Sequence, residues 1–248
     1  MRGTRAAYIG PGMELSAHRN AVTTIAIGLE APFDLRMGTP LGDAAAERVA
    51  IIPGGRWHHL TSRGAMTFLY LDDLPAPCRW SALSKDRERV ADRIRELAGR
   101  LLGDGPETDD TNIVDGLVAI LDLPPPDDPP ERIAVVARAV AANPDEFARI
   151  ATAATLAGLS SSRFQRVFTR TVGVAFGRYR QWCRMGRVAR AMAAGESLTD
   201  AALDAGFSSS AHLSSAFRAM FGIKPSDLVA AGTRFRFDEA NEFHAGCS

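Results

Sequence analysis

Polar side chains gather on the outward side of a helix that the sequence predicts over residues 161–170. Phe164, Val167 and Phe168 have the spacing of a buried helical stripe. The polar residues that this stripe leaves facing outward are Ser162, Arg163, Gln165, Arg166 and Thr169. Glutamine can pair bidentately with adenine and arginine with guanine, so these residues have the chemistry to recognise base edges by hydrogen bonding.

Bond-making chemistry has less support. The three cysteines, Cys78, Cys183 and Cys247, are far apart, so they form neither a disulfide framework nor paired metal-ligand spacing. We find no Ser/His/Asp or Cys/His constellation. The sequence therefore predicts a protein that is not an enzyme and has no cofactor.

The helix that carries Gln165 belongs to a predicted helix-turn-helix unit. Residues 150–157 form a helix of small side chains, and Gly158, Leu159 and Ser160 supply a tight turn, a buried side chain and a helix cap.

The same plan occurs a second time further along the chain. Ser197 is the expected cap of a helix over residues 198–204, a turn follows at 205–208, and residues 209–220 form the next helix. Residues 176–193 would join the two units as a helix about 27 Å long. A connector of this length can hold two recognition helices about one turn of DNA apart.

The last hundred residues resemble the C-terminal DNA-binding domain of AraC/XylS-type regulators. The resemblance covers about residues 131–231 and rests on several separated blocks in the right order. They are Ala157–Ser160 with Phe164–Phe168, then Arg184 and Ala189, and then Ala205–Ser208 through Phe217 and Arg218 to Phe221–Pro225.

The resemblance implies a transcriptional regulator that binds double-stranded DNA at promoter or operator sites, and contact with RNA polymerase is a further expectation. It places Ser162, Gln165 and Arg166 in one major groove. In the next groove it places Ser210, Ala211, Ser214 and Ser215. We expect Arg218 to contact phosphate, and we expect the first unit to supply most of the sequence discrimination.

Charge is divided along the chain in a way that suits this partner. The formal net charge is zero. Residues 131–234, however, carry about 14 basic and 7 acidic side chains, whereas residues 1–130 carry about 14 and 19. The basic half is the one expected to meet phosphates.

The N-terminal region contains short β-rich segments between residues 13 and 71, typical of a small antiparallel sandwich or barrel. The stretches that contain Gly12 to His18 and Pro53 to His58 resemble the two signature segments of cupin barrels. A metal-binding cupin needs a second histidine where this chain has Asn20, so we predict no metal. A small-molecule effector is expected inside the barrel, with the candidate contacts His18, Arg36, Trp57, His58 and Tyr70.

Two amphipathic helices follow, over residues 81–102 and 110–121. The apolar stripe of the first helix includes Val90, Ile94, Leu97 and Leu101, which are candidate contacts in a homodimer. The alternative is that both helices cover the β domain.

The predicted fold is α+β with two domains. A cupin-like β barrel with a helical hairpin occupies residues 1–123, and a proline-rich linker occupies 124–130. An all-α domain with two helix-turn-helix units occupies 131–232, and a flexible tail occupies 233–248. We find neither a signal peptide nor a membrane span, so a soluble cytoplasmic protein is expected. Two alternative functions are a cupin-type enzyme with an accessory DNA-binding domain and a regulator whose barrel binds no ligand.

Overall fold

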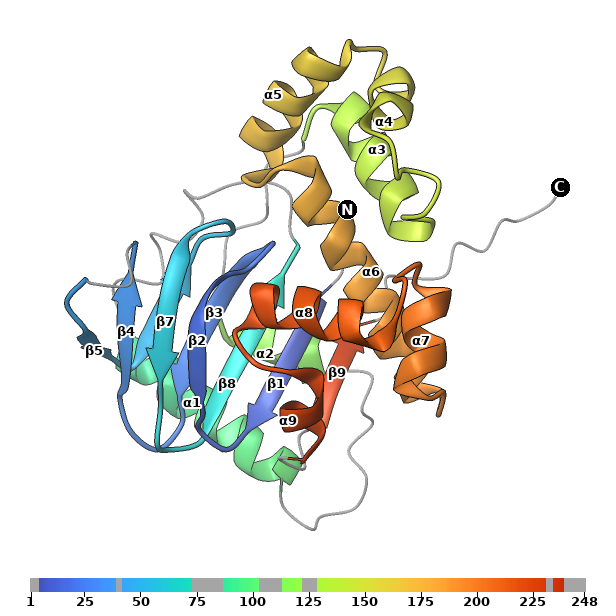
Figure 1. Cartoon of the computed structure of the whole chain (residues 1–248). Coiled ribbons are helices and arrows are strands. Elements are labelled where there is room, and N and C mark those ends of the chain that lie inside the picture. The colour runs from blue at the N-terminus through green and yellow to red at the C-terminus, as the bar shows by residue number, and fades with distance from the viewer. Residues whose placement is uncertain are drawn as a thin grey trace, which may run out of the picture.

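Two antiparallel β-sheets form the N-terminal half of the computed structural model, which describes residues 5–38, 42–72, 87–102, 113–121, 129–230 and 234–238 (Figure 1). Sheet A has the strand order β6-β3-β8-β1-β9, and sheet B has the order β2-β7-β4-β5. The strands of sheet A are β1 (Arg5–Gly10), β3 (Thr23–Gly28), β6 (Val49–Ile52), β8 (Met66–Leu71) and β9 (Arg234–Asp238). Those of sheet B are β2 (Glu14–Arg19), β4 (Phe33–Met37), β5 (Ala45–Glu47) and β7 (Trp57–Thr61).

The inner faces of the two sheets share one apolar core. Tyr8 and Phe68 of sheet A are buried in the same cluster as Leu15, Phe33 and Leu60 of sheet B. Side chains alternate between the faces of a strand, so β2, β4 and β7 of sheet B each contribute inward side chains to this core. The predicted α+β fold with an N-terminal antiparallel β domain is confirmed.

Helices α1 (Arg87–Leu102) and α2 (Ile113–Ile120) cover the other face of sheet A. Ile94 is completely buried against that sheet, and Val90 and Leu97 pack beside it. The prediction of a dimer contact was therefore wrong for Ile94, because the sheet already covers it, whereas Val90 and Leu97 are only partly buried and stay predicted contacts. The side chain of Leu101, the fourth residue of the stripe, lies outside the described residues. Because helices cover one face of sheet A and sheet B packs on the other, β8 is buried along its whole length.

The C-terminal half is helical, as predicted (Figure 1). Its helices are α3 (Glu131–Ala142), α4 (Ile150–Leu156), α5 (Ser161–Val172), α6 (Phe176–Ala193), α7 (Leu198–Asp204), α8 (Ser210–Phe221) and α9 (Pro225–Ala230). Residues 124–128 of the predicted linker lie outside the described residues.

Strand β9 corrects the prediction of a flexible tail over residues 233–248. Residues 234–238 pair antiparallel with β1, from Arg5 opposite Asp238 to Ile9 opposite Arg234. The segment reads Arg-Phe-Arg-Phe-Asp, an alternation with the period of a strand. It is too short to be identified alone, and the edge of β1 supplies the hydrogen bonds that stabilise it.

The core of the β domain continues into the helical domain. The ring of Tyr70 in β8 makes a T-shaped contact with Phe221 of α8 at a centroid distance of 5.3 Å. The same ring lies 6.0 Å from Trp182 of α6. In the described part of the chain the two halves are therefore packed on one another through buried aromatic rings.

Candidate functional site

The first helix-turn-helix unit consists of α4, a turn and α5. Phe164 and Phe168 are buried, and Val167 packs beside them. All five polar positions predicted to face outward, Ser162, Arg163, Gln165, Arg166 and Thr169, are exposed. Ser160 stands at the N-cap of α5, but its side chain makes no capping hydrogen bond. The unit thus presents a polar face on which all the predicted base-reading groups are accessible.

The second unit consists of α7, a turn and α8. Ser197 accepts a hydrogen bond from the Asp200 N–H at 3.1 Å, which confirms it as the cap of α7. Ser209 caps α8 by accepting from the His212 N–H at 3.1 Å. Among the predicted reading residues of α8, Ala211, Ser215 and Arg218 are exposed, whereas Ser210 and Ser214 are partly buried.

Helix α6 is the predicted connector, and its 18 residues match the expected bounds of 176–193. At one end, the ring of Phe176 lies 5.2 Å from Phe164 and 5.3 Å from Phe168. At its middle, Arg184 Nε donates to the Ala205 carbonyl at 2.7 Å. One rigid helix therefore fixes both units.

Arg184 positions the turn of the second unit. Its guanidinium is nearly buried and lies 3.9 Å from the centroid of the Phe207 ring. Burial lowers the pKa of this guanidinium, and the positive charge of Arg180 lowers it further. Arg187, one turn further along α6, binds Asp145 at 2.7 Å and so ties the segment before α4 to the connector.

The end of α8 docks on strand β2 of the β domain. Ser16 donates two hydrogen bonds to the Gly222 carbonyl, from its backbone N–H at 3.0 Å and from its hydroxyl at 2.8 Å. Arg178 of α6 donates to the Arg19 carbonyl at 2.8 Å. We call this region, where β2 meets α6 and α8, the junction.

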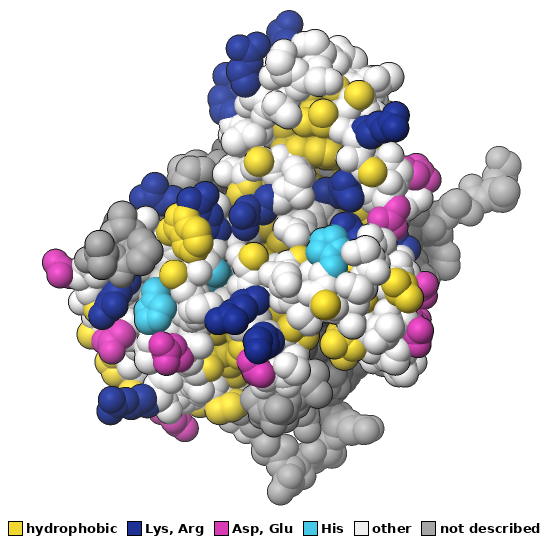
Figure 2. Space-filling view, viewed as in Figure 1, with side chains coloured by type: hydrophobic (Ala, Val, Ile, Leu, Met, Phe, Trp, Pro, Cys, Tyr) yellow, Lys and Arg dark blue, Asp and Glu magenta, His cyan; other side chains and the backbone are white. Residues whose placement is uncertain are grey.

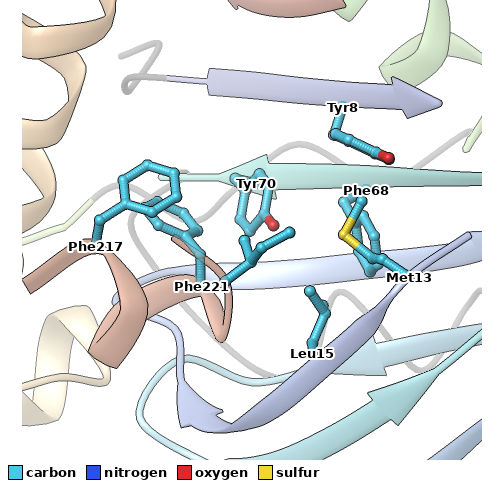
Figure 3. Close-up of a pocket in the computed structure, with 8 residues that line it drawn as sticks. Tyr8, Met13, Leu15, Phe68, Tyr70, Phe217 and Phe221 are labelled. Atoms are coloured by element: carbon cyan, nitrogen blue, oxygen red, sulfur yellow. The ribbon is translucent and has the colours of Figure 1, made fainter. Parts of the chain in front are cut away.

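A small apolar hollow lies at the junction, between α8 and the inside of the β domain (Figure 3). Its lining consists of Tyr8, Met13, Leu15, Phe68, Tyr70, Phe217, Phe221 and Ile223. Figure 3 shows Phe217 and Phe221 projecting from α8 on one side, with Tyr70 between them and the more distant Phe68 and Tyr8. The volume is about 10 Å³, about enough for one water molecule. A larger ligand can enter only if lining side chains move, and Phe217 and Phe221 of α8 are among them.

The five predicted effector contacts divide between the inside and the outside of the β domain. His18, His58 and Tyr70 are buried, and Tyr70 lines the hollow. Arg36 and Trp57 are exposed on the outer face of sheet B. Because Trp57 and His58 are neighbours on one strand, alternation excludes that both face inward. The prediction that Arg36 and Trp57 contact an effector inside the barrel was therefore wrong.

Most of the lining was not identified from sequence. Phe217 and Phe221 have the spacing of a helical core stripe, and they belong to that core as well as to the hollow. Met13 and Leu15 lie far from Ile223 in the chain. Nothing in their local pattern indicates that they meet, because tertiary packing alone joins them.

His18 and His58 form a buried imidazole pair beside the junction. Their ring centroids are 4.0 Å apart. His18 Nδ1 lies 2.7 Å from the Ser16 carbonyl, and His58 Nδ1 lies 3.1 Å from the Arg56 carbonyl. Burial lowers the pKa of His18 to about 3, helped by the nearby His58, and burial also lowers the pKa of His58. Both imidazoles are therefore neutral at pH 7.

Acidification is expected to destabilise the fold through these two histidines. In the unfolded chain each imidazole takes up a proton below about pH 6.5, whereas the folded chain does not, so stability is lost as the pH falls below that value. For His18 the loss approaches about 1.4 kcal/mol per pH unit, and His58 adds to it in the same direction. Urea unfolding of the wild type and of His18→Gln at pH 7.5 and 5.5 measures it. A pH dependence equally steep in both proteins would contradict the assignment.

The described residues contain no group of three or more histidine, cysteine or acidic side chains placed to hold a metal ion. In the same part of the chain, no helix is long and apolar enough to span a membrane.

Comparison with known proteins identifies the C-terminal region. Residues 153–231 match a protein family described as a helix-turn-helix domain. No curated protein matches the chain. Among solved structures, an apo variant of ToxT from Vibrio cholerae strain SCE256 has a TM-score of 0.59 at 13% identity, covering 92% of this chain and 96% of that one. Wild-type ToxT from this strain with a bound unsaturated fatty acid has a TM-score of 0.54 at 11% identity, covering 91% and 94%.

The fold and the two paired helices define a helix-turn-helix DNA-binding protein with an N-terminal β domain. Its C-terminal domain is of the AraC type, and the chain is a DNA-binding transcriptional regulator.

Proposed function

We propose that this regulator reads DNA with the exposed faces of α5 and α8, and that an apolar small molecule bound at the junction controls the placement of α8. One observation carries the proposal: α8 presents exposed polar residues along its outer side and closes the junction hollow with Phe217 and Phe221. A ligand that displaces these rings must act on the helix that meets DNA.

The chemistry of the lining indicates the class of effector. Every residue around the hollow is apolar or aromatic, and Tyr8 already donates its hydroxyl hydrogen to the Pro11 carbonyl at 2.7 Å. Such a lining fits a hydrocarbon chain or ring, with any polar group at the mouth. The fatty-acid complex of ToxT, which shares this fold, makes a long-chain unsaturated fatty acid the first probe to use.

The effector is expected to raise the melting temperature and to change the affinity for DNA. Binding to the folded state alone stabilises it by mass action, and regulation requires different affinities for two arrangements of α8. If a fatty acid alters neither the melting temperature nor the affinity for DNA, the effector part of the proposal fails and DNA reading stands alone. A β domain without a ligand would then be the better description.

Reading by α5 is tested by Arg166→Ala and Arg218→Ala in the full chain, after selection of bound duplexes from a random pool. Arg166→Ala is expected to relax the preference at one or two base pairs by about 10-fold or more, because a bidentate pair contributes about 1–3 kcal/mol. Arg218→Ala is expected to weaken all sequences equally. Equal and uniform losses in both variants would contradict the roles assigned to these residues.

Other parts of the proposal are carried by the sequence alone. Homodimer binding to paired sites, contact with RNA polymerase and the absence of enzymatic activity stay predictions. So do the domain limits at residues 123, 131 and 232. Two copies of an enriched motif in the selected duplexes would support the dimer.

A further inference from the structure

Two arginines meet where the β domain touches the start of α6, and a third belongs to a neighbouring turn of the β domain. Arg178 Nη1 donates to the Arg19 carbonyl at 2.8 Å, so the start of α6 lies on the end of β2. The turn before β7 lies against the turn between α5 and α6, since a Cβ on Gly54 would come within 3.0 Å of Val174 Cγ1. Arg56 belongs to the same turn. We call Arg19, Arg56 and Arg178 the junction arginines.

No carboxylate of the described residues neutralises their positive charge. Within the described residues the structure gives none of the three a carboxylate partner, whereas Arg87 and Arg187 pair with Glu47 and Asp145. Burial lowers the pKa of Arg178, and the charge of Arg19 lowers it further. The first turn of α6 contains no acidic residue. An anion bound here would relieve the repulsion between the guanidinium groups of Arg19 and Arg178.

Arg19 is held in place for such a contact. Its guanidinium carbon lies 4.7 Å from the centroid of the Trp57 ring, a cation–π arrangement. The tryptophan is 37% exposed, which is unusual for so large an apolar side chain on a folded domain. Because the ring restricts the guanidinium, less side-chain entropy is lost when Arg19 binds a partner.

The phosphate backbone of DNA is the anion that suits this position. Arg178 lies in the first turn of α6, directly after the turn that ends α5, and the polar face of α5 is the proposed reader of a major groove. DNA carries about one phosphate charge per 1.7 Å of helix axis, so a groove occupied by α5 brings phosphates close to its ends. Figure 2 shows lysine and arginine side chains across the middle of the face on which α8 lies, with acidic side chains mainly toward its edges.

We propose that the junction arginines bind a backbone phosphate beside the groove read by α5, so that the β domain itself contributes to DNA affinity. The inference rests on the proposed DNA reading by α5. It gives the exposed Trp57 a role outside the barrel, as the support of Arg19.

The test is the affinity of the full chain for its selected duplex, measured by fluorescence anisotropy at several salt concentrations. Arg19→Ala is expected to weaken binding several-fold. The slope of log K against log salt concentration is expected to become less negative by about 0.9, the value for one phosphate contact. Arg19→Lys, which keeps the charge, is expected to retain the slope. The selected sequence stays the same in both variants.

Arg93→Ala is the matched control. Arg93 is an exposed arginine of α1, on the helical cover of sheet A, so this variant removes the same charge away from the junction. Affinity and slope are expected to equal those of the wild type. A less steep salt dependence in Arg19→Ala alone supports the proposal. Equal affinities and equal slopes in Arg19→Ala and Arg93→Ala overturn it.

Two further outcomes distinguish a free phosphate from a DNA phosphate, and the junction contact from DNA reading by α5. If inorganic phosphate raises the melting temperature of the wild type but not of Arg19→Ala, and DNA binding is unaffected, the site binds a free phosphate and the DNA contact is overturned. If Arg166→Ala weakens binding and Arg19→Ala does not, reading by α5 stands without the junction contact. A wild-type chain that enriches no duplex contradicts both.

Discussion

Gly222→Ala is expected to lower the free energy of unfolding by about 2–4 kcal/mol, because it combines backbone strain with overpacking. Gly222 ends α8 with a φ of +76°, in the left-handed region. A Cβ there would lie 2.7 Å from the Ser16 carbonyl oxygen and 2.5 Å from His18 Nδ1. The strand cannot move aside without breaking its two hydrogen bonds to Gly222. Urea unfolding of the full chain measures the loss.

Gly173→Ala is the matched control for this substitution. Gly173 ends α5 with a φ of +85°, and a Cβ at this position would meet no atom within 4 Å. It therefore carries the strain alone, about 1–2 kcal/mol. The difference between the two variants reports the contact of α8 with β2. Equal losses would mean that this contact does not form in solution.

Phe221→Ala is expected to be the most destabilising substitution at the junction, by about 3–5 kcal/mol. Phe221 is nearly buried, and its ring contacts Tyr70, Trp182 and Phe217 at centroid distances of 5.3, 6.2 and 4.4 Å. Because these neighbours come from β8, α6 and α8, the domains cannot collapse together to fill the space. Thermal and urea unfolding measure the change.

Phe217→Ala supplies the comparison, since Phe217 lines the same hollow but is only partly buried. Its loss of stability is expected to be less than that of Phe221→Ala. Both variants enlarge the hollow, so a long-chain fatty acid is expected to stabilise them more than it stabilises the wild type. A fatty acid that stabilises neither variant would show that the hollow is core and not a ligand site.

The helix-turn-helix units could be predicted because their determinants are local. Phe164 and Phe168 recur with the helical period, and Ser197 caps the helix that follows it. The outward positions of α5 then follow by geometry, and the structure shows Gln165 and Arg166 exposed. In α8 the same reasoning was incomplete, since Ser210 and Ser214 are partly buried.

The wrong predictions concern sequence patterns that fit two different structural surroundings equally well. The stripe through Ile94 suits a second subunit or a sheet of the same chain, and only the fold shows that sheet A covers Ile94. Trp57 and His58 are adjacent in a signature-like segment, yet the pleat places them on opposite faces. The junction depends on residues as distant as Ser16 and Gly222, which no local spacing relates.

Strand β9 makes the DNA-binding helices an insertion within the β domain. The chain leaves sheet A after β8, builds the helical domain, and returns to place residues 234–238 beside β1. The helical domain thus follows α1 and α2, which cover sheet A, and leads into β9 of the same sheet. This connection to the β domain on both sides restricts how far the helical domain can rotate. Deletion of the last residues would also remove an edge strand from a sheet whose other strands lie more than 160 positions earlier in the chain.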